Sequence, residues 1–257
     1  IQLGVAEAEI KYKSKKDLLV IYIDSGAAIA GIFTKNKFTA APVIVAKEHL
    51  KISKATRALV VNTGSANAGT GEDGLKSARA VCEMVASELN INATDILPFS
   101  TGIIMTHLPV EKISMGIPIA IKNLKIDNWL NAAESIMTTD TVSKASSARI
   151  IIQGEEVYVT GISKGSGMIE PNMATMLGFI GTNANITKEM LDELIVEVAD
   201  KTFNCITVDG DTSTNDSFII IATKQSNHQL IDSKNQNYYV LKETLLETAK
   251  ILAQSII

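Results

Sequence analysis

The twelve residues from Lys164 to Thr175, KGSGMIEPNMAT, have the composition of a self-cleaving site. Glycines and a proline interrupt regular structure here, and a β-type run over 175–180 then begins with a hydroxyl residue. If the bond between Ala174 and Thr175 is cut, Thr175 gains a free α-amine beside its own Oγ, so that nucleophile and base belong to one residue. An α-amine titrates near pH 7.7–8.0 and can accept the hydroxyl proton at neutral pH. The same Ala-Thr pair also fits an ordinary strand start.

Two other motifs fit catalytic or nucleotide-binding patterns less well. The run Gly69–Gly74 matches the dinucleotide pattern GxGxxG, but Glu72 and Asp73 would put negative charge where a pyrophosphate should lie. The run Gly161–Gly165 matches the hydrolase pattern GxSxG, with His228 downstream. A nucleophile elbow must turn directly into a helix, however, and the glycines and proline that follow oppose one. We therefore expect neither nucleotide binding nor a serine hydrolase.

The chain also lacks the spacing of a metal site. The stretch that starts at Asp209 imitates a calcium loop, but its sixth and twelfth positions are Thr214 and Ile220, where glycine and glutamate are needed. The histidines are too far apart in the sequence to suggest a common metal ion, and we expect surface or packing roles for them: His49, His107 and His228. We predict no metal and no cofactor.

Composition excludes several classes of partner. The 257 residues are 46% hydrophobic, enough for one large domain or two small ones, and the net charge of −4 gives no footprint for nucleic acid outside a short Lys11–Lys16 cluster. Apolar runs such as Leu18–Ile23 fall far short of the ~20 residues of a membrane span. With only Cys82 and Cys205, no disulfide framework is expected. We expect a cytoplasmic protein without nucleic-acid or membrane partners.

Hydrophobic periodicity predicts mixed secondary structure. Strand patterns alternate with helix patterns, and Thr187 has the position of a helix N-cap. We expect strands near 18–24, 27–34, 58–62, 96–99, 175–180, 205–208 and 217–223, a hairpin over 149–162, and helices near 75–89, 129–137, 187–198 and 238–257. This order indicates an α/β or α+β sandwich in which helices cover sheets.

Several motifs together resemble one family. The segment 164–180 is similar to the cleavage segment of the ornithine acetyltransferases, also called glutamate N-acetyltransferases. The chain also contains further motifs similar to those of that family, in the same order along the sequence: Asn62–Ala68, Ser100–Gly102, Met137–Thr141 and Thr207–Asp216. The resemblance covers essentially the whole chain. It implies a layered αββα sandwich and a precursor that cuts itself between Ala174 and Thr175.

The resemblance also implies a reaction and its residues. Thr175 would carry an acetyl group from N2-acetyl-ornithine to glutamate, in arginine biosynthesis, with acetyl-CoA as an open second donor. Thr101 and Gly102 match the family's oxyanion-hole pair. Lys164 and Thr138 match residues that contact substrate, with Thr139 as the alternative to Thr138. Read without the resemblance, Ser-Thr-Gly after a strand is an ordinary turn and Lys164 a solvated lysine.

Two alternatives and a division of the chain follow. A related amidase or aminopeptidase would let water resolve the acyl-threonine, and a truncated chain would be a non-catalytic remnant. Cleavage would give an alpha segment, residues 1–174, and a beta segment, residues 175–257, that stay associated as a heterotetramer. Since the last helix pattern stops at Ile257 without a capping signal, we expect the beta segment to be truncated at its C-terminus.

Overall fold

The computed structural model describes residues 1–53, 55–167 and 176–257. Within that part of the chain the strands form two sheets, of order β1-β2-β4-β5 and β3-β9-β8-β7-β6. The first sheet holds β1 (Gln2–Ala6), β2 (Leu18–Tyr22), β4 (Ala58–Ser65) and β5 (Ile96–Ile103). The second holds β3 (Ala28–Phe33), β6 (Lys144–Ile152), β7 (Glu155–Lys164), β8 (Leu177–Thr182) and β9 (Ser217–Ala222).

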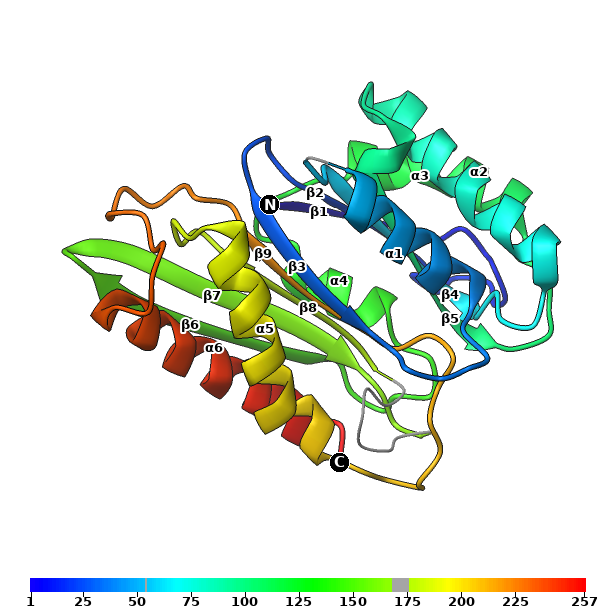
Figure 1. Cartoon of the computed structure of the whole chain (residues 1–257). Helices are drawn as coiled ribbons and strands as arrows, with labels where there is room; N and C mark the ends of the chain where they lie inside the picture. The colour runs from blue at the N-terminus through cyan, green and yellow to red at the C-terminus, as the bar shows by residue number, and fades with distance from the viewer. Residues whose placement is uncertain (54, 168–175) are drawn as a thin grey trace.

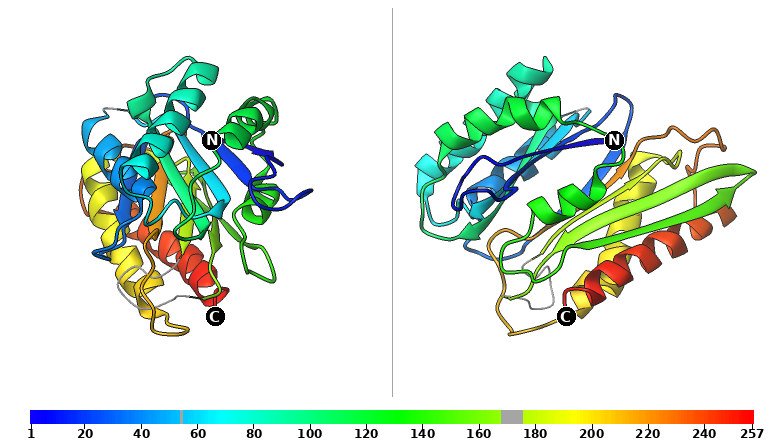
Figure 2. Two further views of the ribbon diagram at one scale, coloured as in Figure 1. Left: turned by 90° about the vertical axis from the view of Figure 1, so that its right-hand side faces the viewer. Right: turned by 180° about the vertical axis from the view of Figure 1, so that it is seen from behind.

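The two sheets stack face to face, with helices on both outer sides (Figures 1 and 2). Helices α1 (Ala41–Ile52), α2 (Gly71–Leu89) and α3 (Val110–Lys122) cover the first sheet, and α5 (Lys188–Lys201) and α6 (Gln236–Gln254) cover the second. The short α4 (Trp129–Ser135) contacts strands of both sheets. The expected αββα sandwich is therefore confirmed. Helices α1 and α3 are not among the helices expected from the sequence.

Alternation along the strands divides the core into layers. In β2, Leu19 and Ile21 face the opposite sheet, whereas Leu18 and Val20 face the helices. In β9, Ile219 and Ile221 face the first sheet, and Ile220 between them belongs to the layer that holds residues of α5 and α6. Because both faces of these strands are buried, their sequences are continuous apolar runs and not alternating ones.

Each sheet contains one parallel pair joined by a helix. Helix α2 connects β4 to β5, and α5 connects β8 to β9. Two parallel strands need such a crossover connection. Because the strands run in the same direction, their carboxyl ends lie at the same edge of the sheet. For β4 and β5 that edge lies at Ser65 and Ile103.

Local predictions are confirmed at most places and wrong at two. The segment Ser100–Gly102, read from the sequence as a turn after a strand, continues β5, which runs to Ile103. Thr187 caps α5, its Oγ1 accepting a hydrogen bond of 3.2 Å from the Met190 N–H. The hairpin forms between β6 and β7. The strand expected over 205–208 is wrong, because a 3-10 helix at Phe203–Cys205 is followed by a loop. Val208 is 46% exposed, so this short run has too few apolar side chains to bury as a strand.

The two segments of the predicted division share one sheet. Strands β8 and β9, both from the C-terminal segment, lie between β3 and β7, which come from the N-terminal segment. The boundary itself, between residues 174 and 175, lies outside the described residues. No helix in the described ranges has both the length and the apolar content needed to cross a bilayer.

Replacing Phe99 by alanine should destabilise the sandwich. The rings of Phe99 in β5 and Phe179 in β8 meet between the sheets, edge to face, with centroids 5.1 Å apart. Because both rings are buried and the truncation would leave a cavity between the sheets, we expect Phe99→Ala to cost about 3–5 kcal/mol of unfolding free energy in urea titrations. Phe38→Ala, which removes a ring that is 54% exposed, is the control. Equal losses from both variants would show that the contact between the sheets is unimportant.

Candidate active site

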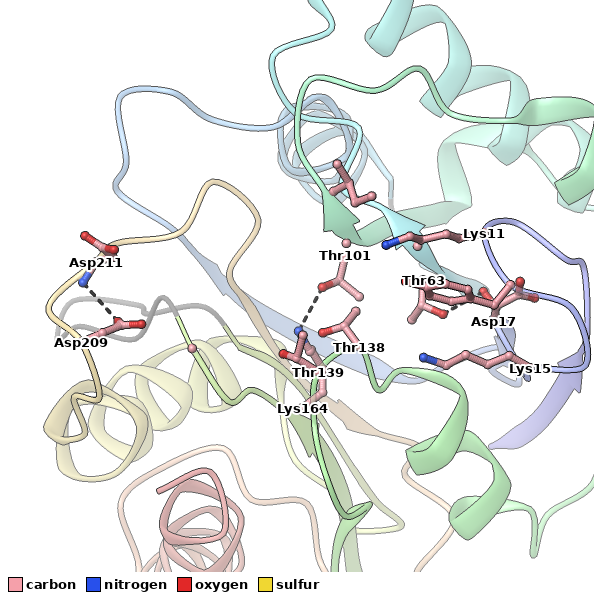
Figure 3. A pocket seen from close by; sticks show the side chains of 15 residues that line it. Lys11, Lys15, Asp17, Thr63, Thr101, Thr138, Thr139, Lys164, Asp209 and Asp211 are labelled. Atoms are coloured by element: carbon pink, nitrogen blue, oxygen red, sulfur yellow. Dashed lines mark hydrogen bonds between the residues drawn. The ribbon is translucent and has the colours of Figure 1, made fainter.

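A cavity of about 460 Å³ opens where the two sheets meet at the ends of β4, β5 and β7 (Figure 3). Thr101, Gly102, Thr138 and Lys164, the residues implied by the sequence resemblance, all line it. They come from three separate parts of the chain. The structure therefore brings these four together, while their roles in a reaction stay predictions.

A hydrogen bond joins the two sheets at this cavity. Lys164 is the last residue of β7, and its Nζ donates to the Thr101 Oγ1 in β5 over 3.0 Å. Both side chains are buried. Since the Thr101 oxygen accepts from the lysine, the hydroxyl hydrogen is left to donate in another direction.

Gly102 is required by a close approach between β4 and β5. Its φ of +136° lies in a region that side-chain-bearing residues rarely adopt, and a Cβ would come within 2.4 Å of the carbonyl carbon of Gly64. Gly64 is also its partner in the parallel register. Without a side chain, the Gly102 backbone is exposed at the cavity.

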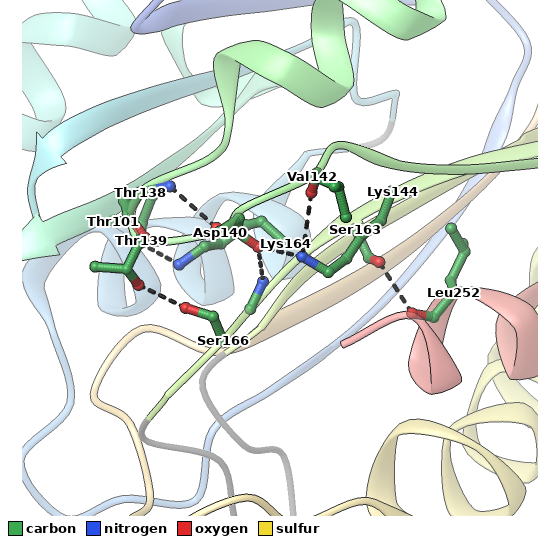
Figure 4. A network of polar contacts seen from close by, with 11 residues as sticks. Thr101, Thr138, Thr139, Asp140, Val142, Lys144, Ser163, Lys164, Ser166 and Leu252 are labelled. Carbon is green, nitrogen blue, oxygen red and sulfur yellow. Dashed lines mark hydrogen bonds and ion pairs between the residues drawn. The ribbon is translucent and has the colours of Figure 1, made fainter. Parts of the chain in front are cut away.

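A buried carboxylate fixes the segment that carries Thr138 (Figure 4). The Asp140 Oδ1 accepts from the Lys144 Nζ at 2.6 Å and from the Gly165 N–H at 2.8 Å, and its Oδ2 accepts from the Thr138 N–H at 3.0 Å. Burial by itself raises the pKa of Asp140, but these hydrogen bonds outweigh burial and hold that pKa below its ordinary value. Asp140 therefore ties the Thr138 turn to the end of β7.

Both threonines of the adjacent pair line the cavity. Thr139 shares a hydrogen bond of 2.6 Å between its Oγ1 and the Ser166 Oγ, and it is the more exposed of the two. Figure 3 shows Thr138 beside Thr101 and Lys164. Thr138 is thus the more buried of the two, and the choice between them as a substrate contact stays a prediction.

Two buried ionisable groups lie at the cavity, Lys164 in its lining and Asp216 outside that lining. Burial lowers the pKa of Lys164 and raises that of Asp216 well above its ordinary value. The Asp216 Oδ1 accepts from the Met176 N–H at 3.0 Å, and among the described residues its Oδ2 has no hydrogen-bond partner. Met176 directly follows Thr175 in the sequence. Ala174 and Thr175 themselves, the predicted cleavage site, lie outside the described residues.

Lysines on a loop form a wall that the sequence analysis did not assign to the site. Lys11, Tyr12 and Lys15 lie between β1 and β2 and line the cavity, and Asp209 and Asp211 line it on another side (Figure 3). The only sequence signals were the short basic cluster and a polar motif whose role was left open. Neither signal reveals that segments so distant in the sequence face one cavity.

The rejected motifs have structural roles. Ser163 is fully buried, and its Oγ donates to the Leu252 carbonyl oxygen over 3.3 Å, so it is not an exposed nucleophile. The His228 Nε2 accepts from the Asn185 N–H, and the His49 Nδ1 bonds to the Ile96 carbonyl oxygen. Within the described ranges, no cluster of side chains suits a metal ion.

Known proteins are similar to this chain in sequence and in fold. A model of the ArgJ family matches residues 2–257. An arginine biosynthesis bifunctional protein ArgJ from Colwellia psychrerythraea is 52% identical over 268 residues, covering 100% of this chain and 63% of that protein. The chain thus spans less than two thirds of that relative's length.

Solved structures agree with this match. The arginine biosynthesis bifunctional protein argJ of Bacillus halodurans is 35% identical and covers 67% of this chain and 90% of its own, with a TM-score of 0.58. An ornithine acetyltransferase from Mycobacterium tuberculosis, solved with ornithine, is 28% identical over 66% of this chain and 90% of its own, with a TM-score of 0.54. An aminopeptidase of Ochrobactrum anthropi, a variant of the Ntn hydrolase fold, covers 99% of this chain and 83% of its own at 8% identity and a TM-score of 0.58, and shares the fold alone.

Replacing Asp216 by asparagine should flatten the dependence of stability on pH. Because the pKa of Asp216 is raised in the folded protein, its contribution to stability is fully present below the unfolded-state pKa and is lost as pH rises through the folded-state pKa. Asp216→Asn has no carboxyl group to ionise. We expect the variant to gain stability relative to wild type as pH rises, by up to ~1.4 kcal/mol per pH unit.

The measurement is urea unfolding of both proteins between about pH 4 and 8. Asp24→Asn, a change of an exposed aspartate, controls for the loss of one carboxylate. A constant difference between wild type and Asp216→Asn across this range would contradict the raised pKa.

Proposed function

This chain belongs to the ArgJ family, and we propose from that premise that it transfers an acetyl group from N2-acetyl-ornithine to glutamate in arginine biosynthesis. The observation that carries the proposal is the convergence of Thr101, Gly102 and Lys164 on one cavity between the sheets. A hydroxyl and a glycine N–H at a strand end are suitable donors for an acyl-transfer oxyanion. Thr175, one residue before Met176, supplies the nucleophile.

Self-cleavage between Ala174 and Thr175 generates that nucleophile in our proposal. It frees the Thr175 α-amine, which then serves as the base for its own hydroxyl. The two pieces would remain together, because β8 and β9 pair with β7 and β3 through backbone hydrogen bonds and contribute to one buried core. We extend this to a heterotetramer with two copies of each piece.

The first half-reaction loads the enzyme. The Thr175 Oγ attacks the acetyl carbonyl carbon of acetyl-ornithine, and the hydroxyl proton moves to the α-amine. The resulting oxyanion is stabilised by the Thr101 hydroxyl and the Gly102 N–H. When the carbon–nitrogen bond breaks, the α-ammonium returns its proton to the leaving nitrogen, so that ornithine departs and an acetyl ester of Thr175 remains.

The second half-reaction reverses these steps with another amine. The glutamate amine attacks the ester carbonyl, the same donors stabilise the oxyanion, and the Thr175 Oγ leaves with the proton that the α-amine relays. N-acetylglutamate forms and the free threonine returns. Because one product leaves before the second substrate binds, the kinetics should be ping-pong.

Lys164 has two tasks in this scheme. Its Nζ donates to the Thr101 Oγ1, which directs the threonine hydrogen toward the cavity and makes the hydroxyl a better donor. A second N–H of Lys164 is available for the α-carboxylate that both substrates share. Thr138, held by Asp140, lies beside Lys164 and contacts the same part of the substrate in our proposal.

Two alternatives differ in what resolves the acyl-enzyme. Water would make the protein an amidase or aminopeptidase, a reading that the 8% identical aminopeptidase supports only through its fold. A chain that folds but converts no substrate would be a non-catalytic remnant. Family membership over residues 2–257 favours acetyl transfer over both. No metal or tightly bound cofactor takes part in the proposed reaction, and acetyl-CoA is the second donor to be assayed.

An intact-mass spectrum tests the proposed nucleophile. Protein made from its complete coding sequence should show two species, one ending at Ala174 and one starting at Thr175. With acetyl-ornithine and no glutamate, the second species should gain one acetyl group, because the ester has no acceptor amine. Adding glutamate should remove it, and a trial with acetyl-CoA shows whether that donor also loads the enzyme.

Thr175→Ala is the matched control and should stay uncut and unlabelled. An uncut wild-type protein that still transfers acetyl groups would refute the self-cleavage. Acetyl groups on any serine would refute Thr175 as the nucleophile, and release of free acetate in place of acetylglutamate would identify the hydrolase.

Replacing Thr101 by alanine should reduce turnover more than binding. The Thr101 hydroxyl is aimed at charge that develops only in the transition state, so we expect kcat to fall by roughly 10²–10³-fold with little change in KM. The assay uses enzyme that is already cleaved, because cutting also passes through an oxyanion. A wild-type kcat with a large increase in KM would make Thr101 a substrate-binding residue instead.

A further inference from the structure

We propose that Lys11 and Lys15 form a cationic wall that binds the side-chain carboxylate of the acyl acceptor and selects glutamate over uncharged amino acids. This inference rests on the proposed acetyl transfer and deepens it. The two proposed substrates share an α-carboxylate but differ at the end of the side chain, which is an ammonium in ornithine and a carboxylate in glutamate. One cavity must therefore accommodate opposite charges.

Asp17 anchors the loop that carries these lysines. The two carboxylate oxygens of Asp17 each accept a backbone N–H at 2.6 Å, one from Ala8 and one from Ile10. The backbone oxygen of Asp17 accepts from the Thr63 N–H in β4 at 2.9 Å. The carboxylate of Asp17, which also lines the cavity, is occupied by the loop's own backbone, so it fixes the loop and makes no direct ion pair with Lys11 or Lys15.

Close packing places Lys11 next to the predicted oxyanion donors. A Cβ built on Gly64 would come within 2.9 Å of the Lys11 Cβ, so the lysine stem lies directly against the backbone of β4. Gly64 is the register partner of Gly102 in β5. The Lys11 stem is thus one strand away from the Gly102 N–H, and its ammonium projects toward the cavity (Figure 3).

Neither ammonium forms a direct ion pair with a described residue, and the charge of Asp17 attracts Lys15 from a distance. Lys11 and Lys15 form no hydrogen bond or ion pair with any described residue, and their Nζ atoms lie 4.6 and 6.0 Å from the Tyr12 ring centroid. Neighbouring Lys16, by contrast, is held by Glu134 at 2.5 Å outside the cavity. Two unpaired cations on a cavity wall attract a carboxylate and repel an ammonium.

The cavity separates its charges. Lys11 and Lys15 line one side together with the backbone-bonded Asp17, so that this side has a net positive charge. Asp209 and Asp211 line the other side, and Thr101 lies between them (Figure 3). With the acetyl carbonyl at Thr101, a carboxylate-ended side chain is drawn to the lysines, and an ammonium-ended one is directed away from them. A donor and an acceptor of opposite side-chain charge can then use one acetylation centre in turn.

The test compares the two half-reactions in the lysine variants. In cleaved protein made from the complete coding sequence, Lys11→Ala with Lys15→Ala should lower kcat/KM for glutamate by roughly 10–100-fold, as expected for a lost charge-assisted contact. The rate of acetyl-enzyme formation from acetyl-ornithine should change little. The preference for glutamate over glutamine as acceptor should shrink by the same factor as kcat/KM for glutamate.

Lys13→Ala is the matched control, because Lys13 is an exposed lysine of the same loop that does not line the cavity. An unchanged preference for glutamate over glutamine in the double variant, or an equal loss in both half-reactions, would overturn the proposal. Failure of wild-type enzyme to form an acetyl-enzyme would instead refute the proposed function. Calorimetric titration of the enzyme with glutamate then tests binding by the cationic wall separately from catalysis. Equal affinity for glutamate in wild type and in the double variant would overturn the proposal.

Discussion

A hydrogen bond between two buried side chains, from the Lys164 Nζ to the Thr101 Oγ1, links the two sheets where the cavity opens. It joins a residue of β5 to a residue of β7, so the site exists only when both sheets are stacked. Burying a lysine is costly, and the lowered pKa of Lys164 reflects that cost. The ion pair of Asp140 with Lys144, buried beside it, holds the adjacent turn in place. The polar cluster thus imposes one geometry on a boundary that is otherwise apolar.

Much of this arrangement could be predicted from the sequence. Continuous apolar runs identified the buried strands, and glycine at position 102 reflects a backbone approach that a Cβ would block. The strand proposed over 205–208 failed because only Ile206 of its apolar residues is buried, whereas Cys205 and Val208 are exposed. Propensity describes a segment, whereas burial is decided by its neighbours.

The walls of the cavity could not be predicted in the same way. Lys11 and Lys15 precede Thr101 by many residues, and Asp209 and Asp211 follow it by more than a hundred. Only the stacking of the sheets brings these loops to one opening. A basic cluster in a sequence is usually a solvated surface, and its position against β4 emerges from the contact of Lys11 with Gly64. The fold therefore converts ordinary surface charge into the walls of a candidate substrate pocket.

The infrared spectrum of the acetyl-enzyme reports whether Thr101, oriented by Lys164, donates a hydrogen bond to the acyl oxygen as proposed. Acetyl-ornithine labelled with carbon-13 at the acetyl carbonyl would mark the ester band on Thr175. Since hydrogen-bond donors polarise a carbonyl and weaken its double bond, we expect a lower stretching frequency in wild type than in Thr101→Val. Coincident bands in the two proteins would contradict it.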